Sequence, residues 1–436
     1  MIEIFNIISQ FLIIFLLFNF PLNLKNIRKI KILDNLNFFE IISINLFIFL
    51  FILLLISFFS TNFTYIIFII LFLSLILNYN SFNYISNSIS IIDLRFIFIF
   101  FLSYLVLSVS IVSNLFLEWD GQVWINKAIN FYDNKSVFNL KILEIDIIKN
   151  YPHLGSMLWG VFWKISIINN EVFGRIIYVF IYVLSIVITV RKLSYQLWLQ
   201  YIFFISFIFF TFDLYLFSGY QECLMFSMIL ILMNLFFRFK NKFDNIFILL
   251  ISLVFFNLLS WVKNEGVIYF LIFVILTLYH VKNYRILIVF CSVSLIVARY
   301  AILNEISSNE AGLLSINLKN FLNFLDLKHI LLTIVLFFKY LIISFFKNTI
   351  WLFIIAFFIL SLLIKRNNLK VFYFISFTSI FFLLGIYLNY YVLESNNLKN
   401  EWFISVTLSR LTYHISAFYI PFIIIFINLF NKVKLK

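Results

Sequence analysis

The chain has 436 residues, of which 64% are hydrophobic and only 12% are charged, and its formal net charge is +13. This composition excludes a soluble globular domain, which needs a larger share of charged residues. The positive charge does not indicate nucleic-acid binding, because Lys and Arg stand in short clusters between apolar runs, as cytoplasmic anchors do. We therefore expect a protein that contacts membrane lipids and no nucleic acid.

Apolar runs of about 17 to 20 residues recur along the chain, and each can cross a hydrocarbon core about 30 Å thick. Backbone groups in lipid must be paired within the segment, so we expect helices and an all-α polytopic fold. Thirteen full spans are predicted: Ile4–Phe20, Ile41–Phe59, Phe63–Leu77, Phe96–Val112, Val172–Val190, Tyr195–Phe212, Cys223–Phe237, Ile246–Val262, Val267–Tyr279, Ile286–Leu303, Ile350–Ile364, Val371–Tyr390 and Leu411–Leu429.

Two further runs, Pro152–Ile168 and Ile330–Phe346, are predicted to lie at the outer surface or only dip in. If neither crosses, every basic cluster faces the cytoplasm, as the charge rule for loops requires. The alternative, that both cross and the rule fails here, stays open. The clusters are Lys25–Lys31, Arg191–Lys192, Arg238–Lys242, Lys282–Arg285, Lys365–Arg366 and Lys432–Lys436.

We expect one integral membrane domain over residues 1–436. Its parts are four spans in 1–113, an outer loop with a juxtamembrane helix in 114–171, and the other spans in 172–436. Cys223 and Cys291 both stand in apolar runs, so neither a disulfide framework nor a cysteine metal site is supported.

Rare residue types concentrate between Glu118 and Trp163, which hold four of the eight Trp. Asp120 and Lys127 follow the end of a span and fall on one face if the segment is helical. A carboxylate there can act as a general base and a cation can hold a phosphate. The simpler alternative is a hydrated acid beside a Trp anchor.

Downstream, Tyr151-Pro152-His153 opens the first uncertain run, and proline suits a first helical turn. His153 either contacts a phosphate or acceptor or is an ordinary interfacial histidine. Three more sets of polar residues stand at predicted span ends on the same side, where ionisable groups are costly unless they reach water. They are Glu222 in SGYQE, then Lys263, Asn264 and Glu265 in KNEG, and Arg410 with His414 in LSRLTYH.

Arg410 has a guanidinium fork suited to phosphate and stands on the outer side against the charge rule. Arg175 and Arg299 rank lower, because they can pair with local acids or carbonyls. The sequence has no nucleotide-phosphate loop, zinc-ligand spacing or serine–histidine–acid order.

The order WDGQVWINKA, NYPHLGSMLW, GYQE, KNEG and LSRLTYH resembles the bacterial GT-C membrane glycosyltransferases. These include protein O-mannosyltransferases and lipid A aminoarabinose transferases. The resemblance covers Glu118 to Phe418. It departs at His153, where members commonly have a second proline, and in the four spans before the first motif.

The resemblance implies inverting transfer of a sugar from a polyprenyl-phosphate donor to an unidentified acceptor outside the bacterial inner membrane. It implies that Asp120 is the base, that Glu265 shapes the site, and that Lys127, Lys263 and Arg410 hold the phosphate. Tyr151, His153, Glu222 and Asn264 complete the expected binding set. Some relatives need a divalent metal, but no acid spacing here demands one, so no cofactor is assigned.

Three other classes stay open: a structural assembly subunit and two rival activities. A transporter or flippase of lipid-linked sugars would place its main charges near the middle of the membrane between repeats. An outward-facing polysaccharide polymerase or ligase would carry its chemistry in one large outer loop.

Overall fold

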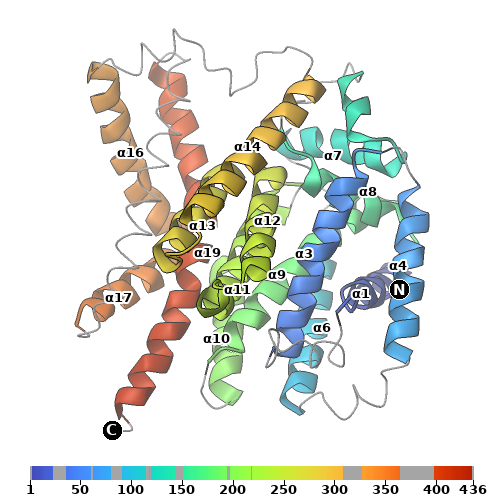
Figure 1. The fold of residues 1–436 in the computed structure, drawn as a ribbon, viewed down its shortest axis with the longest axis horizontal. Coiled ribbons are helices and arrows are strands. Elements are labelled where there is room, and N and C mark those ends of the chain that lie inside the picture. The colour runs from blue at the N-terminus through green and yellow to red at the C-terminus, as the bar shows by residue number, and fades with distance from the viewer. Residues whose placement is uncertain are drawn as a thin grey trace.

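The computed structural model describes residues 2–22, 36–59, 62–79, 91–113, 117, 119–142, 151–193, 197–217, 219–307, 327–363 and 397–434. Every regular element within these ranges is a helix, so the all-helical prediction is confirmed there (Figure 1). The elements are α1 (Ile2–Leu17), α3 (Phe38–Ile56), α4 (Phe63–Tyr79), α6 (Ile91–Val112), α7 (Trp119–Tyr132), η2 (Val137–Lys141), α8 (Leu154–Lys164), α9 (Val172–Val190), α10 (Leu197–Thr211), η3 (Leu214–Phe217), α11 (Glu222–Phe239), η4 (Lys240–Lys242), α12 (Ile246–Val262), α13 (Gly266–His280), α14 (Arg285–Ser307), α16 (Leu327–Lys347), α17 (Ile350–Leu363) and α19 (Asn397–Lys434).

The chain is a polytopic membrane protein. Among the described residues, six helices are long and apolar enough to cross a membrane, or seven if α16 and α17 form one broken span. Five of the predicted spans are shorter apolar helices: α1, α4, α10, α12 and α13. The predicted span Val371–Tyr390 lies outside the described residues.

The first uncertain run does not cross. Its helix, α8, has 11 residues, or roughly 17 Å at 1.5 Å per residue, which is too short for a hydrocarbon core. Leu154 to Phe162 are all buried against α7 and α9. The prediction that this run lies at the outer surface or only dips in stays a prediction. A Cβ atom at Gly160 would lie 2.2 Å from the Ala128 carbonyl oxygen, so glycine permits this close crossing.

The second uncertain run belongs to a bent pair of helices. Ile330–Phe346 falls inside α16, which meets α17 at a bend of 102°, so the two helices form a bent pair. The predicted surface helix and the predicted span Ile350–Ile364 are thus the two arms of that pair.

The first helix, α1, is seen nearly end-on in Figure 1, between α3 and α4, whose axes run up and down the view. Its polar side chains hold it against the end of α8. Gln10 Nε2 donates to the Phe162 carbonyl at 3.3 Å, and Asn6 Oδ1 accepts from the Ile167 amide at 2.9 Å. These contacts explain why α1 crosses its neighbours instead of running beside them.

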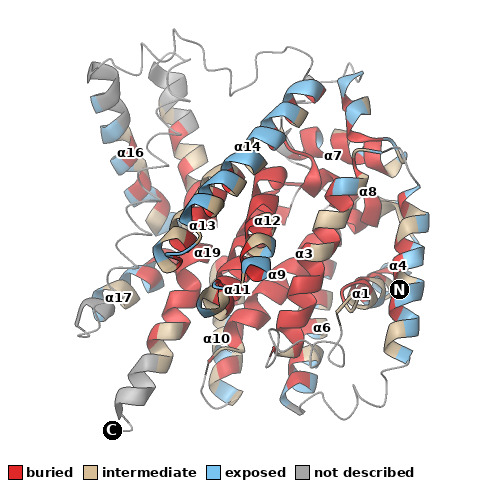
Figure 2. Cartoon of the chain, in the orientation of Figure 1, coloured by how far each residue is buried: buried red, intermediate tan, exposed pale blue. Residues whose placement is uncertain are grey.

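The core surrounds α9, in which every residue is buried. Helices α6, α8, α11 and α3 pack around it, and Figure 2 shows this buried centre against the exposed outer sides of α14 and α4.

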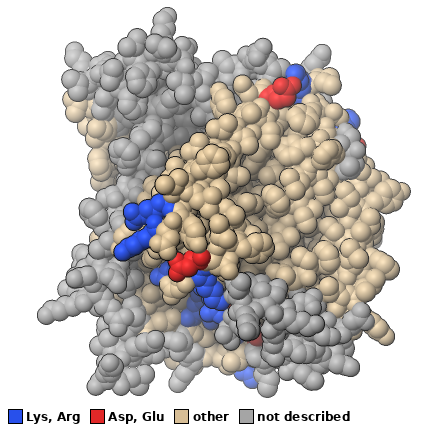
Figure 3. All heavy atoms as spheres, viewed as in Figure 1, with Lys and Arg blue, Asp and Glu red and all other residues tan. Residues whose placement is uncertain are grey.

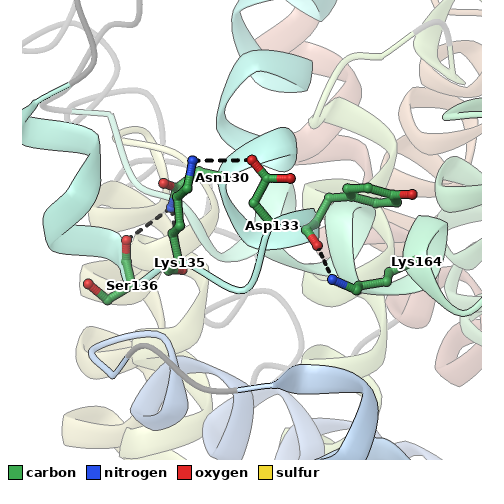
Figure 4. A network of polar contacts seen from close by, with 6 residues as sticks. Asn130, Asp133, Lys135, Ser136 and Lys164 are labelled. Carbon is green, nitrogen blue, oxygen red and sulfur yellow. Dashed lines mark hydrogen bonds and ion pairs between the residues drawn. The ribbon is translucent and has the colours of Figure 1, made fainter.

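The turn that ends α7 is fixed by polar contacts of its own (Figure 4). Asn130 Nδ2 donates to the Ser136 carbonyl at 2.9 Å, and Lys135 lies 3.2 Å from Asp133. Lys164, from the end of α8, donates to the Tyr132 carbonyl at 2.6 Å. The network holds α7 in place over α8.

Several basic clusters gather at one end of the bundle. Arg191 pairs with Asp93 at 2.7 Å, Lys192 donates to the Asn234 carbonyl, and Arg238 lies 3.8 Å from Glu40. These residues stand where α9 and α11 end and where α3 and α6 begin. The η4 lysines and the turn between α13 and α14 lie at the same end of the bundle. On the face of the molecule drawn in Figure 3, most of the basic atoms lie in the lower half of the view.

Candidate functional site

Two turns bring the central charges together. Gly219, with φ of +96°, precedes α11, and Glu222 is the first residue of that helix. Lys263 follows the last residue of α12. Lys263 Nζ lies 2.7 Å from Glu222 Oε1 and 3.9 Å from Glu265 Oε1. Burial alone would lower the pKa of the Lys263 ammonium, but the two carboxylates raise it above its ordinary value, so Lys263 is charged.

Arg410 completes this group, which we call the charged cluster: Glu222, Lys263, Glu265 and Arg410. Its Nη1 lies 3.7 Å from Glu222 Oε1, and its guanidinium lies 4.6 Å from the centre of the Tyr220 ring. The Arg410 side chain is 24% exposed, whereas those of the other three are 9% exposed or less. Arg410 is therefore the member that a ligand can reach most easily.

The setting of Arg410 differs from the prediction. It lies well inside the 38-residue helix α19 and not in a loop before the last span. One turn later, His414 Nδ1 lies 3.1 Å from the Tyr269 hydroxyl of α13. This contact joins α19 to α13 next to the charged cluster.

Asn264 is held by Arg299 and does not point freely into a site. Arg299 donates to Asn264 Oδ1 at 2.6 Å and to the Ser260 carbonyl at 2.7 Å. Gly266 sits so close to the Leu259 carbonyl that a Cβ atom there would lie 1.9 Å from its oxygen. Arg299 and Gly266 together fix the KNEG turn, and this supports the prediction that Arg299 pairs locally.

Lys127 and Tyr151 form a second contact. The fully buried Lys127 donates from Nζ to the Tyr151 carbonyl at 2.7 Å and lies 5.5 Å from the centre of the Trp124 ring. It has no carboxylate partner among the residues whose side chains are described. Burial lowers the pKa of Lys127 to about 7. Near neutral pH this lysine therefore exchanges between charged and neutral forms.

His153 lies near both Lys127 and Arg299, whose charges act on its ring. Ser57 Oγ donates to the Leu54 carbonyl at 2.6 Å, so it accepts from His153 Nε2, 2.9 Å away. The other ring nitrogen, Nδ1, is then an unprotonated acceptor, buried and without a hydrogen-bond partner among the described residues. Burial, with the charges of Lys127 and Arg299, lowers the pKa of His153 to about 3, so the ring is neutral at physiological pH.

Asp120 belongs to the first turn of α7, and its side chain lies outside the described residues. Its backbone is next to the turn before α11. A Cβ atom at Gly219 would lie 2.8 Å from the Cα atom of Gly121. The structure thus brings the WDG segment to the GYQE segment, as a shared site requires.

The motifs therefore converge. Glu222, Lys263, Glu265 and Arg410 form one cluster, Asn264 is bound at its edge, and Lys127, Tyr151 and His153 form a neighbouring group. The sequence pattern does not single out Tyr269 and Tyr220, which contact His414 and Arg410. The position of Tyr220 within GYQE is a signal for that residue, whereas Tyr269 belongs to none of the motifs.

Within the described ranges, no group of three or more His, Cys, Asp or Glu residues could hold a metal ion. Searches against protein-family models, curated proteins and solved structures found no match to this chain.

Proposed function

We propose that this protein is a membrane glycosyltransferase that moves a sugar from a polyprenyl-phosphate donor to an acceptor at the outer face of the membrane. Thirteen spans in a GT-C-like arrangement are part of the proposal. The observation that carries it is the convergence of charged residues from α11, α12, α13 and α19 with the start of α7 at one end of the bundle.

The orientation is argued from the basic residues. Glu222 begins α11 and Arg238 lies in its last turn, so the charged cluster and the basic end are separated by roughly 27 Å, the length of an 18-residue helix. Basic clusters favour the cytoplasmic side. The charged cluster then belongs to the opposite, outer side.

The chemistry assigned to these residues is a direct displacement. The acceptor hydroxyl forms a bond to the anomeric carbon while the bond from that carbon to the phosphate oxygen breaks. The hydroxyl proton passes to the Asp120 carboxylate. Arg410 stabilises the charge that develops on the departing lipid phosphate. Lys263 is already engaged by Glu222 and Glu265, so it keeps the cluster neutral, and its predicted role as a direct phosphate ligand is not carried forward.

One observation favours transport as a second candidate. The 102° bend between α16 and α17 resembles the discontinuous helices with which transporters hold anionic substrates. A flippase of lipid-linked sugars would use such a break.

The test is transfer from a panel of radiolabelled polyprenyl-phosphate sugars in purified membranes, with donor movement across vesicles measured in parallel. We expect label to pass to an acceptor from at least one donor. Movement of intact donor without transfer would replace the proposal with the flippase.

A further inference from the structure

A polar cleft of about 380 Å³ lies beside the charged cluster. It is formed by the end of α10, the junction of α16 and α17, and one face of α19. Its lining includes the polar side chains of Asp213, Lys347, Asn348, Thr349, Ser405, Ser409 and Arg410. Its volume falls within the range of about 300 to 1,000 Å³ that is usual for small-molecule sites.

Two cations define this cleft. Lys347, the last residue of α16, is exposed, and no ion pair ties it to another described residue. Arg410 faces the cleft and also approaches Glu222, so it forms the wall between the cleft and the charged cluster. Asp213 is the single acid in the lining of the cleft, and the carboxylates near Arg410 belong to the charged cluster on the other side of this wall.

The start of a helix adds hydrogen-bond donors. Asn348 and Thr349 line the cleft immediately before α17, a helix of 14 residues. The first amide groups of a helix favour an anion where they lack a partner. The Asn348 amide donates to the Ser344 carbonyl, and those of Trp351 and Leu352 donate to the Asn348 and Thr349 carbonyls. The Thr349 and Ile350 amides are left without a partner among the described residues. The helix start, the two cations and the cavity therefore select the same kind of ligand, one that carries a compact negative charge.

The walls of the cleft are fixed before any ligand binds. Asn348 Nδ2 donates to the Ser409 carbonyl at 3.0 Å and to Thr412 Oγ1 at 2.8 Å, which ties the α16–α17 junction to α19. The Tyr413 hydroxyl donates to the Thr211 carbonyl at 3.0 Å, which ties α19 to α10. A site held in this way loses little freedom when it binds a ligand.

We propose that this cleft binds the phosphoryl group of the substrate, with Lys347 and Arg410 as its two cationic ligands. The inference deepens the proposed function, on which it rests for the identity of the substrate, and assigns the phosphate to the cleft in place of Lys127 and Lys263. The phosphoryl group belongs either to a lipid headgroup or to a soluble phosphate. Charge-assisted hydrogen bonds from both cations hold it.

The experiment measures binding of a fluorescent polyprenyl phosphate to the full-length protein in detergent. Competitors are inorganic phosphate and a soluble sugar phosphate, and the variants are Lys347→Ala and Arg410→Gln. Lys339→Ala is the control, because Lys339 is another exposed lysine of α16 but pairs with Glu401 at 2.7 Å away from the cleft lining. We expect Lys347→Ala and Arg410→Gln to weaken binding about tenfold or more and Lys339→Ala to leave it unchanged.

Each outcome decides something. Variant-sensitive binding of the lipid that soluble phosphates displace only weakly supports a lipid headgroup. Equal binding of soluble sugar phosphate, lost in the same variants, supports the cleft with a soluble source. Equal affinity in Lys347→Ala and Lys339→Ala, or no binding of any probe, overturns the inference. Variant-sensitive binding without any glycosyl transfer keeps the cleft and removes the proposed function instead.

Discussion

Lys263 Nζ and Glu222 Oε1 lie 2.7 Å apart, and neither side chain is more than 7% exposed. A buried ion pair adds little stability compared with apolar residues, but losing one partner leaves a buried charge and costs about 3 to 5 kcal/mol. Arg410 and Glu265 flank this pair, so two carboxylates balance two cations. Loss of any one member alone therefore leaves an unbalanced charge in the cluster.

The pair predicts strong coupling between its two partners. Glu222→Gln and Lys263→Met should each lower stability by about 3 kcal/mol, and the double variant should lose less than the sum because no uncompensated charge remains. Thermal unfolding in detergent measures this. Lys339→Ala is the matched control, since its ion pair has the same 2.7 Å length but is exposed, and its melting temperature should not change. Additive losses in the double variant would contradict the account.

Lys127 predicts a pH-dependent difference between variants. Its pKa falls from 10.5 to about 7 in the folded protein, so between these values the unfolded chain binds more protons and the wild type gains stability as pH rises. Lys127→Met removes this dependence. The variant should be most stabilised relative to wild type at about pH 6, and its advantage should shrink by about 1.4 kcal/mol per pH unit above pH 7. Melting curves of both proteins at several pH values test this. A difference in stability between variant and wild type that does not change with pH would contradict a lowered pKa for Lys127.

The orientation predicts which residues reagents reach from each side. Lys141 pairs with Glu305 near the end of α14, and Lys282 precedes its start, so the two lie roughly 35 Å apart along this 23-residue helix. In intact cells a membrane-impermeant maleimide should label Lys141→Cys and should label Lys282→Cys only after lysis. Of the two background cysteines, Cys223 is buried, and Cys291 is half-buried within α14, a helix long and apolar enough to cross the membrane. The reverse pattern would place the charged cluster in the cytoplasm.

The backbone conformation of Gly219 predicts that an added side chain lowers stability and transfer. Its φ of +96° strains other residues by about 1 to 3 kcal/mol, and a Cβ atom would meet the Gly121 Cα atom at 2.8 Å. Gly219→Ala should lower the melting temperature and reduce transfer, because the start of α7 must shift away from α11. Gly219→Asn is the discriminating variant, since asparagine tolerates positive φ better than alanine does. If Asn restores transfer, backbone strain rather than the contact with α7 sets the effect.

Much of the helical layout was predictable from the sequence, because apolar runs in lipid must be helices. Two predicted spans, Val172–Val190 and Ile246–Val262, match α9 and α12 residue for residue. The apolar length of the run Pro152–Ile168 left its crossing uncertain, and the structure shows that its first two residues and its last four are not helical, which leaves α8 too short to cross. Hydropathy counts apolar residues and does not detect where a helix ends.

The site was predictable only as a set of motifs. Rare charges at predicted span ends indicated Glu222, Lys263, Glu265 and Arg410. The sequence did not show that the charged Lys263 would lie between two carboxylates. Lys347 was missed because it ends an apolar run like any interfacial anchor. Its relevance depends on the bend before α17 and on the cleft shared with Arg410, and both are tertiary features.

The central claim is that Asp120 is the base of a sugar transfer, and the rate of that transfer in two matched variants tests it most directly. Asp120→Asn removes the carboxylate at the start of α7, and Asp133→Asn removes an exposed carboxylate just after its end, whose one ion-pair partner among the described residues is Lys135 in the turn. With the donor that the wild type accepts, Asp120→Asn should slow transfer by at least about a hundredfold, and Asp133→Asn should keep the wild-type rate. A wild-type rate in Asp120→Asn would contradict the account.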